Sequence, residues 1–178
     1  MNCRHLIGNE PFVYIYADDV IVPNRFPQMV QMYEELGGSI LPCLRMTQDV
    51  EFKRYGVVGG EHVRDGVLHM NTIVEKPGRE NAPSDLASVG GYLFNPEIFD
   101  YLERMESDVP EGSEFMLQPV IHQMIQEGKQ FFACELLGSH YYDTGSKLEY
   151  LKTVVDFALK RKDVGESLRT YLQHKVSE

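Results

Sequence analysis

The apolar and polar stretches of the chain alternate in a way that predicts strands and helices in succession. Residues 12–17 form a continuous run of apolar and aromatic side chains that ends in the carboxylates Asp18 and Asp19. A short run of this composition is typical of a strand buried on both faces of a parallel sheet. An amphipathic helix over 26–36 and a strand over 39–44 are expected next. These three segments together predict a βαβ unit.

The later segments continue the mixture of strands and helices. Apolar alternation between turn residues predicts antiparallel strands over 57–75 and a further strand over 86–94. The second of these contains Gly90-Gly91, a pair typical of a bulge or of a close approach of the backbone to a ligand. The remaining predicted elements are helices at 96–105, 117–126, 147–159 and 163–172, and a strand at 130–136. The length of 178 residues fits one domain over 1–178.

Composition and charge exclude several classes of protein. The net charge of −10 makes nucleic acid and an anionic membrane surface poor partners. No apolar run approaches the ~20 residues that span a bilayer, and the N-terminus lacks the apolar stretch of a signal peptide. The three cysteines lie far apart, which argues against a disulfide framework and a local zinc cluster. A reducing, cytoplasmic location is therefore expected.

Three places along the chain could carry chemistry, and each has a plain structural alternative. Asp18-Asp19 stands at the carboxyl end of the first predicted strand, where it could hold Mg²⁺ or could simply start a turn. Glu75 and Lys76 could bind sugar hydroxyls and a phosphate, or form a solvated strand end. Asp143 could be a second metal ligand or could cap the turn that follows it. The six histidines show no ligand spacing.

The ordered set of motifs resembles the sugar-1-phosphate nucleotidylyltransferases, and within them the bacterial UTP–glucose-1-phosphate uridylyltransferases (UDP-glucose pyrophosphorylases). The resemblance runs over about residues 6–172, nearly the whole chain, and includes the Pro-Glu-Ile-Phe sequence at 96–99. Each motif is weak alone, and their order and spacing make the resemblance specific. The motifs are Tyr14-Ile15-Tyr16-Ala17-Asp18-Asp19, Lys53-Arg54-Tyr55-Gly56-Val57-Val58, Val74-Glu75-Lys76-Pro77, Ala82-Pro83-Ser84, Ser88-Val89-Gly90-Gly91-Tyr92 and Tyr142-Asp143-Thr144-Gly145.

The resemblance implies a fold, a reaction and a set of site residues. The fold would be α/β, a three-layer Rossmann-like nucleotide-diphospho-sugar transferase fold with a mixed, mostly parallel sheet. The reaction would transfer a uridylyl group from UTP to glucose-1-phosphate, giving UDP-glucose and pyrophosphate, with Mg²⁺ as cofactor and catalysis by positioning and charge neutralisation. Asp18 matches a catalytic aspartate that holds Mg²⁺, and Asp143 a second metal position. Lys76 matches the catalytic cation on the sugar phosphate. The matching substrate-binding residues are Gly56, Glu75, Lys76, Val89 and Gly90.

The sequence also departs from the family pattern. The glycine-rich strand–loop–helix that carries Gly-x-Gly-Thr-Arg-like residues and grips the nucleotide has no match here, and residues 112–117 differ from the usual run. The chain is therefore expected to be the C-terminal portion of such an enzyme, lacking the N-terminal nucleotide-binding part. We expect it to pair with that part, to form a homo-oligomer through the exposed surface, or to be only marginally stable. Two alternatives are a non-catalytic sugar-phosphate-binding or interaction fragment, and a metal-dependent glycosyltransferase-like donor-binding domain.

Overall fold

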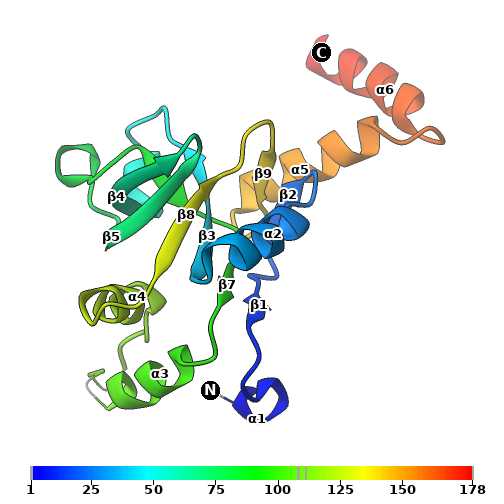
Figure 1. Cartoon of the computed structure of the whole chain (residues 1–178). Coiled ribbons are helices and arrows are strands. Elements are labelled where there is room, and N and C mark those ends of the chain that lie inside the picture. The colour runs from blue at the N-terminus through cyan, green and yellow to red at the C-terminus, as the bar shows by residue number, and fades with distance from the viewer. Residues whose placement is uncertain (1, 108, 111, 178) are drawn as a thin grey trace.

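A seven-stranded sheet forms the centre of the computed structural model, which describes residues 2–107, 109–110 and 112–177 (Figure 1). A second sheet of two antiparallel strands, β2 (Asp19–Val22) and β9 (His140–Asp143), lies beside it. The strands of the larger sheet are, in the order in which they lie, β1 (Phe12–Tyr14), β7 (Tyr92–Phe94), β3 (Ser39–Arg45), β6 (Leu86–Ser88), β4 (Gly56–Arg64), β5 (Val67–Glu75) and β8 (Phe131–Glu135).

The directions of these strands differ from the expectation of a mostly parallel sheet. Only β3 and β8 run parallel to each other, and the other pairings among the described residues are antiparallel. The expectation is therefore wrong, because close connections such as the Asp65-Gly66 turn between β4 and β5 force neighbouring strands to reverse. Since β3 pairs with β8 as well as with β6, five strands (β3, β6, β4, β5 and β8) close into a barrel-like ring.

The first strand is shorter and more exposed than its composition predicts. β1 spans three residues at the edge of the sheet, and Val13 and Tyr14 are 39% and 41% exposed. It pairs with β7, which separates it from β3. Consecutive side chains of a strand point to opposite faces, and those of Val13 and Tyr14 are both exposed, so the prediction of burial on both faces is wrong. β1 is an edge strand, because among the described residues no strand pairs with its outer side. The βαβ unit is present, but an antiparallel strand lies between its two strands.

Helices cover both faces of β3. Ile40 and Leu41, which are consecutive in this strand, belong to different hydrophobic clusters because their side chains point to opposite faces. Met29 and Met32 of α2 pack in the cluster of Ile40, whereas α3 and α4 contribute to the cluster of Leu41. The helices are α1 (Arg4–Ile7), α2 (Phe26–Leu36), α3 (Ile98–Glu106), α4 (Leu117–Gln126), α5 (Lys147–Leu159) and α6 (Gly165–Ser177).

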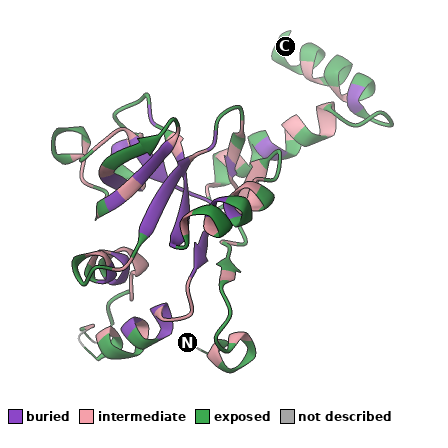
Figure 2. Ribbon diagram, viewed as in Figure 1, coloured by how far each residue is buried: buried purple, intermediate pink, exposed green. Residues whose placement is uncertain are grey.

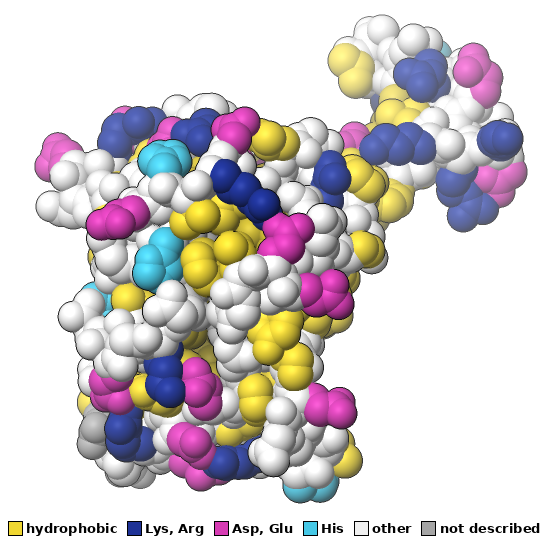
Figure 3. Space-filling view, viewed as in Figure 1, with side chains coloured by type: hydrophobic (Ala, Val, Ile, Leu, Met, Phe, Trp, Pro, Cys, Tyr) yellow, Lys and Arg dark blue, Asp and Glu magenta, His cyan; other side chains and the backbone are white. Residues whose placement is uncertain are grey.

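The last two helices leave the body of the molecule as an arm, and the buried residues gather in the sheets and in the helix faces against them (Figures 1 and 2). α5 packs against β9, and α6 packs against α5. The arm carries exposed apolar side chains such as Leu151 and Val154 among lysines and arginines (Figure 3). Within the described residues, no helix is both long enough and apolar enough to cross a membrane.

Candidate active site

A cavity of about 170 Å³ is lined by residues of both sheets. It brings together Asp18, Gly56, Glu75 and Val89, four residues that the sequence had singled out. The long-range strand pairings produce this convergence, because β4, β5 and β6 are neighbours in the larger sheet. The lining residues are Tyr16, Asp18, Asp19, Arg54, Tyr55, Gly56, Glu75, Ser88, Val89, Tyr92, Gln118 and Tyr141.

The two predicted metal ligands, Asp18 and Asp143, both lie close to Gly145, and of the two only Asp18 lines the cavity. The backbone N–H and the hydroxyl of Thr144 donate hydrogen bonds to the Asp18 carbonyl oxygen at 2.8 and 2.7 Å, which fixes the two loops together. A Cβ placed on Gly145 would lie 2.5 Å from Asp18 Oδ2 and 3.3 Å from Asp143 Oδ1. A side chain at Gly145 would therefore fill the space between the two carboxylates, and glycine leaves that space open.

Asp19, the neighbour of Asp18, has a supporting role. Its Oδ1 accepts a hydrogen bond from the Tyr141 hydroxyl at 2.6 Å, and its Oδ2 accepts one from the backbone N–H of Gly90 at 3.0 Å. Burial raises the pKa of the Asp19 carboxyl, the two hydrogen bonds lower it, and the nearby carboxylates of Asp18 and Asp143 raise it. Both oxygens of Asp19 are thus engaged, whereas the Asp18 carboxylate accepts no hydrogen bond from the described part of the chain.

Glu75 presents a buried acceptor to the cavity. Its Oε2 has no hydrogen-bond partner within the described residues, and a Cβ on Gly56 would lie 3.1 Å from it. Its Oε1 lies 3.2 Å from Nζ of Lys76, which occupies a left-handed conformation with φ of 48°. Lys76 is thereby turned beside Glu75 instead of to the opposite face, because β5 ends at Glu75 and Pro77 follows. The Lys76 side chain is 55% exposed and does not line the cavity.

Arg54 is a site residue to which the sequence analysis assigned no role. Its Nη2 lies 2.5 Å from Asp143 Oδ2, and its guanidinium carbon lies 5.4 Å from the centre of the Tyr55 ring. The signal that could have found it was its place directly before Tyr55-Gly56, inside a motif that carries the family resemblance.

Comparison with known proteins decides the family. The model of the family described as "Nucleotidyl transferase" matches residues 1–159. The chain belongs to this family. The chain is 36% identical over 180 residues to the UTP–glucose-1-phosphate uridylyltransferase of Streptococcus pneumoniae serotype 4, covering 97% of this chain and 58% of the relative. It is 35% identical over 173 residues to UTP–glucose-1-phosphate uridylyltransferase 1 of Staphylococcus saprophyticus, covering 94% and 58%.

Solved structures give the same relationship. The crystal structure of a UDP-glucose pyrophosphorylase complexed with UDP-glucose is 32% identical, with a TM-score of 0.77 over 89% of this chain and 60% of that one. UDP-glucose pyrophosphorylase from Acinetobacter baumannii reaches a TM-score of 0.81 at 24% identity, over 97% and 59%, which supports the mixed α/β fold. The resemblance seen in the sequence is confirmed. The chain spans about 58% of the length of the curated relatives it matches.

Val89 and Gly90 differ in their position relative to the cavity. Val89 is buried, lines the cavity, and donates its backbone N–H to the Pro42 carbonyl oxygen at 3.1 Å. Gly90 lies outside the lining, where its N–H supports Asp19. Its φ is +76°, and a Cβ there would come within 2.4 Å of Ile21 Cδ1. A residue with a side chain would therefore disturb the position of Asp19.

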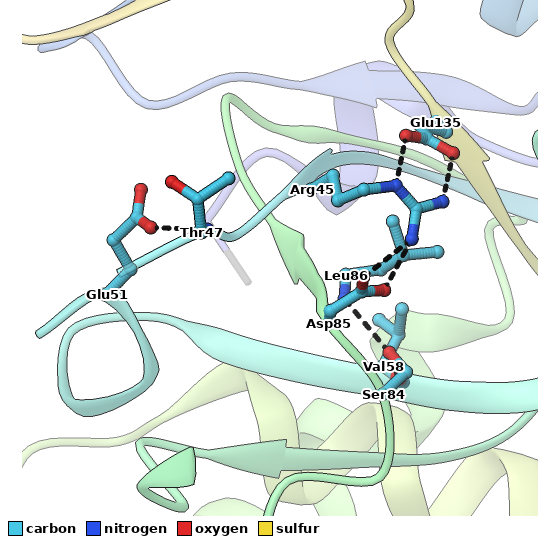
Figure 4. A network of polar contacts seen from close by, with 8 residues as sticks. All are labelled: Arg45, Thr47, Glu51, Val58, Ser84, Asp85, Leu86 and Glu135. Atoms are coloured by element: carbon cyan, nitrogen blue, oxygen red, sulfur yellow. Dashed lines mark hydrogen bonds and ion pairs between the residues drawn. The ribbon is translucent and has the colours of Figure 1, made fainter. Parts of the chain in front are cut away.

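A polar network around Arg45 and Glu51 lies just before Arg54 in the sequence (Figure 4). Arg45 donates to Asp85 at 2.7 Å and to Glu135 at 2.6–2.9 Å, which joins three parts of the ring of strands. These carboxylates raise the pKa of the Arg45 guanidinium, with the hydrogen bonds to Glu135 as the larger cause. Glu51 Oε2 accepts the backbone N–H groups of Thr47 and Gln48 at 2.8 and 2.7 Å. The turn before Arg54 is therefore held in one conformation.

The site residues of this chain fit a magnesium ion in part. Asp18 and Asp143 supply hard carboxylate oxygens, the ligands that Mg²⁺ prefers. Among the described residues, no group of three or more His, Cys, Asp or Glu forms a metal cluster. Two carboxylates suit Mg²⁺, which keeps several waters and takes further ligands from substrate phosphates. The Arg54 ion pair on Asp143 Oδ2 leaves Asp18 as the more open ligand.

Proposed function

We propose that this chain provides the sugar-phosphate site and the metal aspartate of a UTP–glucose-1-phosphate uridylyltransferase. The observation that carries the proposal is Glu75 Oε2, a buried acceptor that has no partner among the described residues and lies in the same cavity as the open carboxylate of Asp18. An unmade hydrogen bond of a buried group costs about 1–3 kcal/mol. A ligand hydroxyl that donates to Glu75 would recover this free energy.

Each site residue has a part in the proposed reaction. Glu75 accepts hydrogen bonds from sugar hydroxyls, Gly56 lets the sugar approach the backbone, and Val89 forms an apolar wall. Lys76 attracts the sugar phosphate as a point charge. Gly90 acts through its N–H on Asp19, instead of by touching the sugar.

The proposed reaction joins glucose-1-phosphate to the α-phosphorus of UTP. A phosphate oxygen of the sugar forms the new P–O bond, the bond between the α-phosphorus and its bridge to the β-phosphate breaks, and pyrophosphate leaves with the electron pair. Asp18 and Asp143 would hold Mg²⁺, which when bound neutralises phosphate charge. The chain itself orients the sugar and excludes water on its side of the site.

Three finer points are part of the same proposal. We infer that residues 1–178 act as one domain, and that the whole enzyme has a three-layer Rossmann-like fold. We also infer that contacts to UTP are completed by further polypeptide, in a second copy or in a separate segment, because the relatives are longer than the part that this chain matches. The exposed edge of β1 is a suitable place for such pairing.

Two measurements test the proposal. Calorimetry with glucose-1-phosphate should show binding that Glu75→Gln weakens about tenfold, because a charge-assisted hydrogen bond is lost. The matched control is Glu97→Gln, since Glu97 also pairs with a lysine, Lys129 at 2.9 Å, but lies outside the cavity. Pyrophosphate release from UTP and glucose-1-phosphate with Mg²⁺ should fall more than about tenfold in Asp18→Asn.

The outcomes separate the proposal from its rivals. Binding of glucose-1-phosphate without turnover would reduce this chain to a sugar-phosphate-binding fragment. Hydrolysis or transfer of UDP-glucose to an acceptor, without formation of UDP-glucose from UTP, would favour the glycosyltransferase alternative. No binding by well-folded protein would refute the sugar-phosphate site.

A further inference from the structure

The charges around the cavity do not match an anionic ligand. Three carboxylates, those of Asp18, Asp19 and Glu75, belong to its lining. Arg54 is the one cation among the lining residues that the structure describes. The Nζ of Lys76 lies outside the lining and is 3.2 Å from Glu75 Oε1. A phosphate in this cavity therefore meets mostly like charge, unless Arg54 turns toward it and adds to the positive charge that Lys76 supplies from outside the lining.

Arg54 has the freedom and the donors to do so. Its side chain is 39% exposed, and only its Nη2 is bonded to Asp143 Oδ2 within the described residues. A guanidinium carries five N–H donors in a planar fork that suits a phosphate. Most of these donors remain available for a second partner.

Asp143 does not depend on Arg54 for its position. Its Oδ1 accepts the backbone N–H groups of Gly145 and Ser146 at 3.1 and 3.3 Å, so the carboxylate keeps its place when Oδ2 is released. The turn that precedes Arg54 is also fixed, by Glu51 and by Phe52, which is 2% exposed. The movement required is that of one side chain on a rigid backbone.

We propose that Arg54 exchanges partners, leaving Asp143 to bind the phosphate of the incoming sugar phosphate. This inference rests on the proposed function and names a further substrate-binding residue for it. In the free protein the Arg54 guanidinium donates to Asp143, and in the complex the phosphate oxygens accept its hydrogen bonds instead. The exchange would also free Asp143 Oδ2 as a ligand for a metal ion.

Calorimetry with glucose-1-phosphate, without metal, tests the exchange on the full chain. We expect Arg54→Gln to weaken binding about tenfold or more. The affinity of Arg54→Lys should be intermediate, because lysine keeps the positive charge but lacks the planar pair of N–H donors of a guanidinium. Binding of glucose, which lacks the phosphate, should be equal in wild type and Arg54→Gln. The control is Arg64→Gln, since Arg64 forms a similar exposed pair with Glu35 at 2.5 Å away from the cavity.

Asp143→Asn separates phosphate binding from a purely structural ion pair. If Asp143 only holds Arg54 ready, this variant should bind glucose-1-phosphate at least as tightly as wild type, and the double variant should match Arg54→Gln. An equal loss in Asp143→Asn and Arg54→Gln would overturn the inference. So would wild-type affinity in Arg54→Gln when Glu75→Gln loses binding, a result that leaves the proposed function standing. Absence of binding by wild-type protein would refute the proposed function itself.

Discussion

The hydrogen bond between Tyr141 and Asp19 gives a test of how the acidic centre of the cavity is held. Tyr141→Phe removes the hydroxyl that donates to Asp19 Oδ1 at 2.6 Å and keeps the ring. Asp19 then retains the N–H of Gly90 as its hydrogen-bond donor within the described residues. Asp19 and Tyr141 are both half-buried, so water replaces the lost donor only in part.

The size of the effect follows from the charge of the acceptor. A hydrogen bond to a charged group contributes about 1.5–3 kcal/mol, and partial access of water places this one near the lower end. We expect the free energy of unfolding to fall by about 1.5 kcal/mol at neutral pH. For a chain of this length, that corresponds to a melting temperature lower by about 3–6 °C.

The pH dependence of the loss is a sharper criterion than its size. Burial raises the pKa of Asp19 above its unfolded value, and the Tyr141 hydrogen bond opposes that rise. The stability that comes from this raised pKa is present below the unfolded pKa and is lost as the pH rises through the folded pKa. Tyr141→Phe raises the folded pKa further. The variant should therefore lose more stability at about pH 7 than at about pH 3, which lies below the unfolded pKa, because the proton removes the charge that the hydrogen bond stabilises.

Urea unfolding at both pH values measures this difference. Tyr171→Phe is the matched control, because Tyr171 is 58% exposed on α6, and should change stability by less than about 0.5 kcal/mol. A double-mutant cycle with Asp19→Asn isolates the pair. An equal loss at the two pH values, or a coupling free energy below about 0.5 kcal/mol, would refute the reasoning.

Three further predictions concern the backbone, an exposed carboxylate and the oligomeric state. Gly90→Ala should destabilise by about 2–3 kcal/mol in urea unfolding, because of its positive φ and the contact with Ile21. Gly37→Ala, with φ of +75° in the left-handed region and open space around it, should cost only about 1 kcal/mol. Equal losses in the two variants would contradict the steric argument. Hydrogen bonds from Gln123 and two other side chains lower the pKa of Glu127 from 4.5 to about 2, so the stability that they contribute is present above pH 4.5 and is lost as the pH falls through about 2. In Glu127→Gln, the melting temperature should therefore fall less steeply as the pH is lowered through this range. An unchanged dependence of the melting temperature on acid pH would show that these bonds have no effect on folding. The exposed edge of β1 and the exposed apolar side chains of the arm formed by α5 and α6 predict self-association. Light scattering should detect a mass above that of one chain. A monomeric mass at every concentration would contradict this prediction.

Several elements could be predicted locally because their signals lie within one segment. The helix expected over 26–36 is α2, since apolar side chains at helical spacing have a single face to bury. The antiparallel pair expected over 57–75 is β4 and β5, which the Asp65-Gly66 turn joins. In these cases hydrophobic period and turn chemistry agree with the final structure.

The first strand shows where local reasoning failed. An apolar run indicates that a segment favours a strand, but it carries no information on which strands will flank it. β1 pairs on one side with β7 and is exposed on the other within the described residues. The direction of the sheet likewise depends on which strands meet, and those contacts join residues far apart in the chain.

The residue types of the candidate site were determined by the sequence, through motifs around Asp18, Gly56, Glu75 and Asp143 whose order identifies the family. Only the tertiary structure decided which of these groups meet and which remain open. The pairing of β2 with β9 sets Asp19 opposite Asp143, and Tyr141 with Gly90 then engages Asp19 and leaves Asp18 free. It also decided that Arg54 lines the cavity and Lys76 does not. The physical reason is that side-chain identity is a local property, whereas distance, burial and hydrogen-bond partners are set by strand register between distant segments.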